Sequence, residues 1–129
     1  MTMLTLKLAD GGETDIPISS VLLLEEGPDK ALFVVYTLDR QQNQSDKVTD
    51  NYGFLKKKLI DGMFPKGIEV TKQVEKDKFR LFISESYIVA RRDLLDKETP
   101  AKTRLTLNVN GPIFSVDVLE TRKQLDGED

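Results

Sequence analysis

Short stretches in which apolar and polar residues alternate are the feature of this sequence that most limits its possible folds. Leu4, Leu6 and Leu8 alternate with polar neighbours, and a turn segment, Asp-Gly-Gly at residues 10–12, follows them. A period of two places alternate side chains on one face of a β-strand, so this stretch predicts a half-buried strand. Similar stretches recur along the chain. The sequence therefore predicts a mainly β fold, either all-β or α+β, with short helices.

Two runs of consecutive apolar residues, at 21–24 and 32–36, depart from this alternation. Because neighbouring side chains of a strand point to opposite faces, both faces of these two strands need cover. A short helix can cover one face of a small sheet, and an uncovered second face would leave an apolar patch that monomers seldom expose. We therefore expect self-association or docking into a larger assembly, with Leu22 and Leu24 among the contacts. The alternative is a monomer whose two sheets close face to face.

A short sequence motif occurs twice in the chain with small differences. Residues 56–62 are KKKLIDG and residues 122–127 are RKQLDG, 66 positions later. The alternation of residues 68–70 likewise follows that of residues 4–6 after 64 positions, and the spacing rises to about 71 before it returns to 66. This pattern is what two copies of one unit would show after separate changes in loop length. The alternative is that strands bounded by regular turns resemble one another by chance.

The predicted architecture is two tandem β-β-β-β-α units, residues 1–64 and 65–129, packed together as one sandwich- or barrel-like domain. Each unit ends in the helical motif, and the loops between its strands differ in length between the copies. A chain of 129 residues is long enough for one real core and short for two independent ones.

Two helices are expected. The first should cover residues 51–61, where Thr49 or Asp50 can cap the first turn and Gly62 can end the helix. The second should lie near residues 118–125. It is the weaker of the two because a charged arginine lies on the face that its apolar residues would share.

Composition narrows the class of protein. Hydrophobic residues make up 39% and charged residues 32% of the chain, as in a soluble globular protein. The net charge of −3 argues against an ordinary basic nucleic-acid binder. The start of the chain alternates and so does not resemble a signal peptide, and the apolar runs are too short to span a bilayer. We expect a soluble protein, intracellular or within an assembled particle, that does not act in a membrane.

The residues that usually carry chemistry are scarce. The chain has no cysteine and no histidine, which removes disulfides, thiolate metal sites and the commonest general base. The acidic residues around the first turn lack the regular spacing of a calcium loop, and the glycines there lack the pattern of a phosphate-binding loop. We therefore expect no enzyme activity, no metal and no cofactor.

Two kinds of function remain. The first is a structural or protein-interaction module, a small subunit of a larger assembly such as a viral particle. The polar segment 39–47 has almost nothing to bury and is expected to be a surface loop or a partner-contacting arm. The candidate contacts from this segment and from the basic middle of the chain are Arg40, Gln41, Gln42, Asn43, Gln44, Arg91 and Arg92.

The second kind of function is a nucleic-acid-binding regulatory domain. Residues 66–104 contain 10 basic and 7 acidic residues with aromatic residues between them, as a single-strand-binding sheet would require. Binding to phosphates would weaken steeply with salt, whereas apolar docking would not. The acidic net charge makes nucleic acid the less favoured partner.

The order of strand, turn, strand, apolar patch and short helix resembles the small β-rich modules of the LytTR type and related short flagellar regulatory proteins. The residues concerned are at 6–11, 18–21 and 27–29, and the likeness is one of residue classes over about half of the chain. This chain lacks the strongly basic segments with which such modules read DNA, so the resemblance implies no site residue here.

Overall fold

The structure is a computed structural model that describes residues 2–38, 42–108 and 111–127. Within those residues the chain forms ten strands, two α-helices and three short 3-10 turns, and is therefore mainly β as the sequence predicts. The first half contains β1 (Met3–Lys7), β2 (Glu13–Pro17), β3 (Val21–Glu26), β4 (Leu32–Tyr36), β5 (Gln44–Val48) and α1 (Tyr52–Asp61). The second half contains β6 (Gly67–Val74), β7 (Asp77–Ser84), β8 (Ile88–Asp93), β9 (Thr103–Asn108), β10 (Ile113–Val118) and α2 (Arg122–Leu125).

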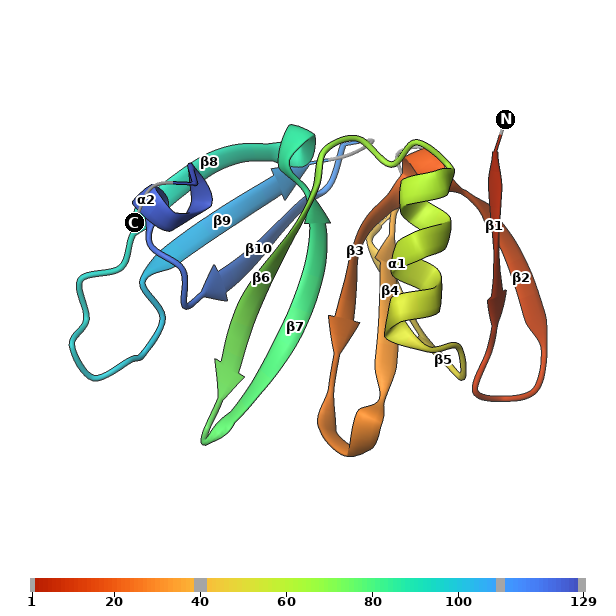
Figure 1. Cartoon of the computed structure of the whole chain (residues 1–129), viewed down its shortest axis with the longest axis horizontal. Coiled ribbons are helices and arrows are strands. Elements are labelled where there is room, and N and C mark those ends of the chain that lie inside the picture. Colours follow the sequence, from red (N-terminus) through yellow and green to blue (C-terminus); the bar gives the residue numbers. More distant parts are fainter. Residues whose placement is uncertain (1, 39–41, 109–110, 128–129) are drawn as a thin grey trace.

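The strands form three antiparallel sheets (Figure 1). The largest has five strands in the order β5-β4-β3-β7-β6. The other two are the β1–β2 hairpin and a three-stranded sheet in the order β10-β9-β8. Helix α1 lies across β3 and β4, while the β1–β2 hairpin and the three-stranded sheet occupy opposite ends of the molecule (Figure 1).

The five-stranded sheet separates two hydrophobic cores. One core contains Leu24 together with Leu55 of α1 and residues of the β1–β2 hairpin. The other contains Leu22 together with Leu105 and Leu107 of the three-stranded sheet. All five of these side chains are fully buried. A single chain thus covers both faces of β3, as the consecutive apolar residues at 21–24 require.

Main-chain hydrogen bonds also join the three sheets to one another at their edges. The N–H of Thr49 donates to the carbonyl oxygen of Lys7 over 2.8 Å, which links the end of β5 to β1. The N–H of Leu119 donates to the carbonyl oxygen of Thr71 over 2.8 Å, which links the end of β10 to β6. The ten strands therefore follow one another in the spatial order β2-β1-β5-β4-β3-β7-β6-β10-β9-β8.

The two halves match in local irregularities as well as in the order of their elements. The β3–β4 pairing shifts register between Val21 and Leu23, and the β8–β9 pairing shifts between Ile88 and Ala90. Both shifts occur in the first three residues of a strand that follows a 3-10 turn. A β-bulge of this kind bends its strand. Both halves therefore bend at the same place.

A second match concerns an acidic side chain two residues before each helix. The N–H of Lys7 donates to Asp50 over 2.8 Å, and the N–H of Thr71 donates to Glu120 over the same distance. In each half the carboxylate thereby ties the first strand of the hairpin to the start of the helix. A common origin of the halves by duplication stays a prediction.

Helix α1 begins one residue later than the predicted caps would have placed it. The side chain of Asn51 accepts hydrogen bonds from the N–H groups of Gly53, over 2.8 Å, and Phe54, over 3.3 Å. The prediction that Thr49 or Asp50 caps the helix is therefore wrong, because the carboxylate of Asp50 is engaged by β1 instead. The helix ends at Gly62 as predicted.

Each half has five strands before its helix, one more than predicted. In the first half the extra strand is β5, which takes its residues from the polar segment expected to be a loop. Val48 buries its side chain, and the hydroxyl of Tyr36 donates to Asp46 over 2.7 Å. These two contacts add to the antiparallel main-chain pairing of β5 with β4, which covers five residue pairs. In the second half β10 extends to Val118, so α2 has only four residues.

Candidate protein-interaction site

Leu22 and Leu24, two of the predicted partner contacts, are both 0% exposed. Leu22 packs in the core under the three-stranded sheet, and Leu24 packs in the core under α1. Neither side chain reaches the surface, because the chain itself covers both faces of β3. These two residues therefore do not belong to a surface that a partner could contact in this fold.

The polar segment between β4 and β5 supplied five more candidates. Arg40 and Gln41 lie outside the described residues, and Gln42 is exposed. Asn43 is half-buried, and Gln44 is the first residue of β5. Gln42, Asn43 and Gln44 therefore do not form one exposed arm, because Asn43 is half-buried and β5 begins at Gln44.

Asn43 has an internal role. Its side-chain oxygen accepts a hydrogen bond from the hydroxyl of Thr37, and its side-chain nitrogen donates to the carbonyl oxygen of Ile113 over 3.3 Å. Ile113 begins β10, so this side chain connects the β4–β5 link of the first half to the second half.

Arg91 and Arg92 lie side by side on β8, and both are exposed. The guanidinium group of Arg91 is 2.7 Å from the carboxylate of Asp126, just after α2. Of the predicted contacts, these two arginines are the ones that the structure places together on an open strand.

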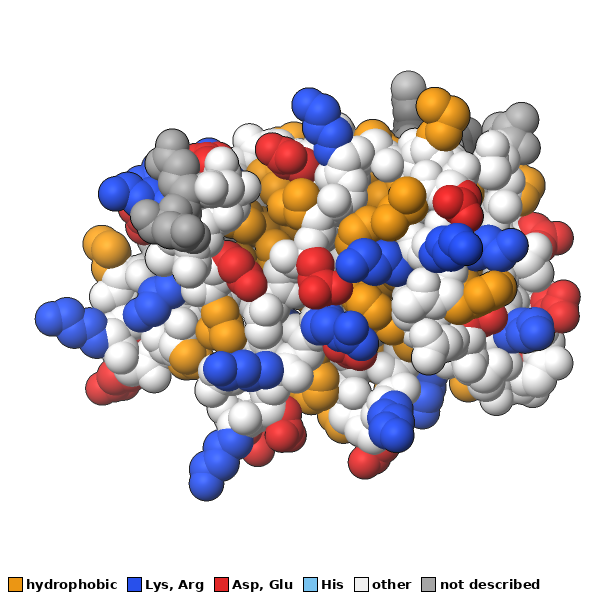
Figure 2. All heavy atoms as spheres, viewed as in Figure 1, with side chains coloured by type: hydrophobic (Ala, Val, Ile, Leu, Met, Phe, Trp, Pro, Cys, Tyr) orange, Lys and Arg blue, Asp and Glu red, His pale blue; other side chains and the backbone are white. Residues whose placement is uncertain are grey.

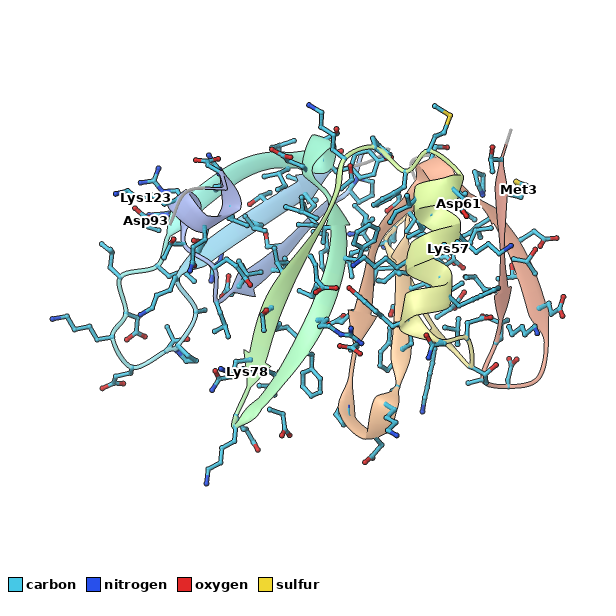
Figure 3. The ribbon with its side chains drawn as sticks, viewed as in Figure 1. Met3, Lys57, Asp61, Lys78, Asp93 and Lys123 are labelled. Carbon is cyan, nitrogen blue, oxygen red and sulfur yellow. The ribbon has the colours of Figure 1, made fainter. Side chains whose placement is uncertain are left out.

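Within the described residues six strands lie at the edges of the three sheets, and four of them, β1, β5, β6 and β10, are joined near their ends to the neighbouring sheet by main-chain hydrogen bonds. The other two, β8 and β2, have no such bond within that part of the chain and are open edges. β8 pairs with β9 alone, and β2 pairs with β1 alone, so each ends the series of ten strands. An open edge presents main-chain N–H and C=O groups to which another strand can be added. The edges lie at opposite ends of the molecule, as the labelled Asp93 on β8 and Met3 on β1 show (Figure 3). We take the β8 edge and the β2 edge as the candidate interaction site.

The β8 edge is mainly basic. Besides Arg91 and Arg92 it carries Asp93, whose carboxylate is held by Arg122 at the start of α2. The two groups form a bidentate pair with nitrogen–oxygen distances of 2.8 and 3.0 Å. The hydrogen bond from Arg122 lowers the pKa of Asp93 below its ordinary value of 3.8. The one acid of the edge is thus already paired with a base.

The β2 edge is acidic. Glu13 and Asp15 are exposed, while Ile16 points into the core. The carboxylate of Asp15 accepts a hydrogen bond from the hydroxyl of Thr5 on β1, which fixes its position across the hairpin. The two open edges of the chain therefore carry opposite charge.

The pairing of β3 with β7 is an example, inside this chain, of the edge strand of one half paired with the edge strand of the other. It joins the two halves through three residue pairs, which run from Leu23–Ile83 to Glu25–Leu81. Phe82, in the middle of β7, packs in the same core as the residues of α1. Side chains from both halves thus fill one core at this junction.

An ion pair closes the end of the β3–β7 pairing. Glu26 accepts hydrogen bonds from Arg80 Nε and Arg80 Nη2, each over 2.8 Å, and from the Arg80 N–H over 3.0 Å. These bonds lower the pKa of Glu26 below its ordinary value and raise that of Arg80. The guanidinium lies 4.3 Å from the ring centre of Tyr52, whose hydroxyl pKa is raised by burial.

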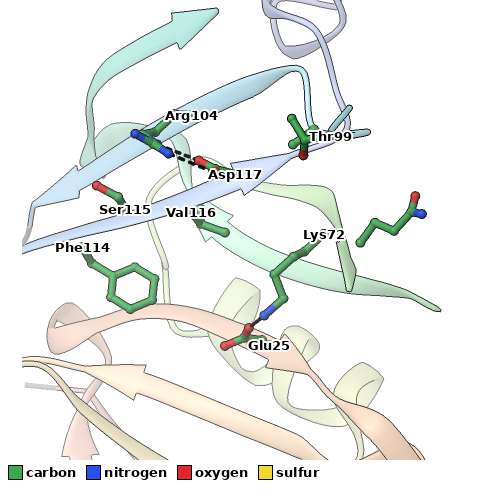
Figure 4. A pocket seen from close by; sticks show the side chains of 10 residues that line it. Glu25, Lys72, Thr99, Arg104, Phe114, Ser115, Val116 and Asp117 are labelled. Atoms are coloured by element: carbon green, nitrogen blue, oxygen red, sulfur yellow. Dashed lines mark hydrogen bonds and ion pairs between the residues drawn. The ribbon is translucent and has the colours of Figure 1, made fainter. Parts of the chain in front are cut away.

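A hollow of about 480 Å³ lies between β10, β6 and β3 (Figure 4). Its charged residues face one another in pairs, Lys72 with Glu25 and Arg104 with Asp117. Burial lowers the pKa of Lys72 below its ordinary value. Because the four charges neutralise one another, the hollow presents no net charge to a ligand. Among the described residues, no cluster of three acidic side chains could hold a metal ion.

Part of the basic middle of the chain is engaged in internal ion pairs. Of the ten basic residues at 66–104, four are paired with acids: Lys72, Arg80, Arg91 and Arg104. Figure 2 shows both signs of charge interspersed over one face of the molecule. On this face the charges do not form the continuous basic groove that tracks a nucleic-acid backbone (Figure 2).

No helix in the described part of the chain is both long enough and apolar enough to cross a bilayer. No family model, curated protein or solved structure matches the chain.

The sequence predicts partner contacts on the β8 edge of the candidate site and none on the β2 edge. Arg91 and Arg92 stood out as adjacent like charges, whereas Glu13 and Asp15 resembled the solvated flank of a hairpin. Their common property is that each pair lies on an edge strand, which depends on which distant strands become neighbours. The signal available in the sequence was the opposite charge of the two segments that become β2 and β8.

Proposed function

We propose that this chain is a non-enzymatic protein-interaction module, a small subunit of a larger assembly such as a viral particle. It binds its neighbours by strand addition at the β8 edge and the β2 edge. The observation that carries this proposal is that the series of ten strands ends in two open edges of opposite charge. An open strand with nothing to pair with is a liability in a free protein and a ready contact in an assembly.

Exposure along β8 supports a docking role. Val89 is 61% exposed, although it lies in a strand and is flanked by residues that pair with β9. β-branched residues in strands usually face a packed surface. A partner would supply the strand that lies beside β8 on its open side.

We propose in addition that residues 1–64 and 65–129 are copies of one unit of five strands and a helix. The shared order of elements, the matching register shifts and the two carboxylates that tie a hairpin to a helix support it. In such a pair of units, the β3–β7 pairing is a contact between copies. One copy of the unit would then bind another copy by strand addition.

Binding of nucleic acid by residues 66–104 is the less supported function. Four of the basic residues in this segment are held by acids of the same chain. Those acids would compete with phosphates for the same guanidinium and ammonium groups.

Site-specific photo-crosslinking tests the proposed function. A photoreactive phenylalanine analogue replaces Val89 on the β8 edge or Glu13 on the β2 edge, in the cells or particles that contain the chain. Lys76, exposed in the turn between β6 and β7, is the matched control position. We expect crosslinks to protein from both edge positions and none from the control. Absence of protein crosslinks at both edges would overturn the proposal.

A further inference from the structure

We propose that the partner at these edges is a second copy of this chain, with β8 of one copy paired to β2 of the next. The register would be the one in which β3 pairs with β7 inside the chain. This inference rests on the proposed function and names the partner of the same site. The chain would thus assemble head to tail by repeating its own internal junction.

The correspondence between strands fixes the register. β3 and β8 each follow a 3-10 turn and carry the same register shift, so Leu23 corresponds to Ala90. β2 and β7 are each the second strand of a hairpin that ends in such a turn, so Ile16 corresponds to Ile83. Leu23 pairs with Ile83 inside the chain, so Ala90 of one copy would pair with Ile16 of the next.

This register brings the opposite charges of the two edges face to face. The next pair inside the chain is Leu24 with Phe82, two side chains that share one core. The corresponding residues are Arg91 of one copy, whose guanidinium group also binds Asp126 of its own chain, and Asp15 of the next. Opposite charges directly across two strands stabilise their pairing. An apolar pair at the internal junction is thus replaced by an ion pair between copies, which suits an interface that is open to water before assembly.

The cluster at the end of the junction changes in charge between the two cases, from one carboxylate and one guanidinium inside the chain to two carboxylates and one guanidinium between copies. Inside the chain, Glu26 of β3 binds Arg80 of β7, and Arg80 stacks on Tyr52, the first residue of α1. The corresponding residues between copies are Asp93 of β8, Glu13 of the next copy and Arg122, the first residue of α2. The three positions again hold one guanidinium.

In the proposed junction the guanidinium group belongs to Arg122 of helix α2, whereas in the internal junction it belongs to Arg80 of strand β7. Arg122 already binds Asp93 over 2.8 Å, and Glu13 would approach on the side where Arg80 lies in the internal junction. A guanidinium group has enough donors to bind two carboxylates. Arg122 therefore prevents the repulsion that Asp93 and Glu13 would otherwise have as direct neighbours.

An exposed apolar residue fits the same arrangement. Val89 corresponds to Leu22, since each is the second residue of its strand. Leu22 is fully buried because the second half packs against it, whereas Val89 is 61% exposed. A second copy in the proposed register would cover Val89 with its hairpin, as the β6–β7 hairpin covers Leu22.

Two different surfaces meet in this contact, so it is heterologous. Repetition produces a closed ring if the rotation between copies closes and a filament if it does not. In a filament each added copy leaves the same two edges free at the ends of the series, whereas a closed ring leaves neither edge free.

Charge exchange tests this inference by sedimentation velocity, from micromolar to submillimolar concentration. The wild-type chain is expected to form species larger than the 14.6 kDa monomer. R91E or D15R alone would place like charges opposite each other and weaken association about tenfold or more. R91E combined with D15R in one chain would restore association. So would mixing the two single variants, because two intact edges then meet.

The control is K76E, which changes charge equally in the exposed β6–β7 turn and should leave association unchanged. Thermal unfolding at low concentration shows that each variant still folds. A wild-type chain that stays monomeric, or a double variant that is not restored, would overturn the pairing between copies. If Val89 then crosslinks to a different protein, strand addition at the edges still stands. If neither Val89 nor Glu13 crosslinks to a protein, both proposals fail.

Discussion

At the scale of single residues, the junction between the halves depends on one position that has no side chain. Gly67, the first residue of β6, lies directly against the ring of Phe82. A Cβ atom at residue 67 would be 2.1 Å from the Phe82 Cζ atom. Phe82 is 2% exposed and also packs on Phe64, with 5.6 Å between the ring centres, so the ring has little room to move. The absence of a side chain at residue 67 is what lets this ring fill the core.

Gly67→Ala is therefore expected to destabilise the protein. Overpacking of a filled core typically costs about 1–3 kcal/mol in free energy of unfolding. Urea denaturation followed by circular dichroism measures this change. Gly12→Ala is the matched control, because its Cβ would lie 3.6 Å from the nearest side-chain atom and the effect on the unfolded chain is the same. Equal stability of the two variants would contradict the proposed role of Gly67.

At the scale of elements, α1 owes its start to a side chain rather than to its own composition. Three lysines occupy consecutive positions of this ten-residue helix, and an isolated helix of that length is marginal in water. Asn51 supplies the partner for two N–H groups that the helix itself leaves unpaired. The apolar side chains Leu55 and Leu59 then bury the helix on the sheet.

Asn51→Ala should lower the free energy of unfolding by about 1 kcal/mol, as loss of an N-cap does elsewhere. Asn51→Asp keeps the accepting oxygen and adds a negative charge near the helix N-terminus, so its stability should be close to that of the wild type. Thermal unfolding of the two variants and the wild type checks the expectation. A loss of stability in both variants would mean that the residue acts through something other than its cap.

Elements also show how far the sequence could predict this fold. The strands whose apolar residues alternate or run together, such as β1 and β3, were predictable because burial alone defines them. β5 was not, since Val48 is its one buried residue and its partner strand lies on the other side of a loop. The position of β8 at an edge was likewise hidden. Which strand lies beside which depends on packing between the halves, and no local pattern encodes it.

At the scale of the whole molecule, the two halves share cores across the β3–β7 pairing, so its ion pair bears on the stability of both. Hydrogen bonds from Arg80 lower the pKa of Glu26 below its ordinary value of 4.5. A carboxyl whose pKa is lowered by folding contributes stability above its unfolded pKa. That contribution is lost as the pH falls through the folded pKa.

Glu26→Gln should therefore reduce the free energy of unfolding at pH 7 by about 1 kcal/mol, the size expected for a partly exposed ion pair with good geometry. At an acid pH below the lowered pKa of Glu26 the difference between variant and wild type should shrink, because the wild-type carboxylate is protonated there. Urea denaturation at both pH values measures this. Glu75→Gln, in the exposed β6–β7 turn, is the control. A difference that does not depend on pH would contradict the role assigned to the charge of Glu26.

The β3–β7 pairing also determines how the molecule would respond to tension. The first strand, β1, and the last helix, α2, lie at opposite ends of the long axis, so a pull on the two ends passes through this pairing (Figure 1). It consists of three residue pairs, whereas β3 and β4 are joined by five. Among the pairings within the five-stranded sheet it has the fewest residue pairs, so we expect it to be the first of these to rupture in an optical-tweezers experiment, and at lower force in Glu26→Gln. The five residues between α1 and β6 would then act as a tether, and the protein would lengthen under load and shorten again on release.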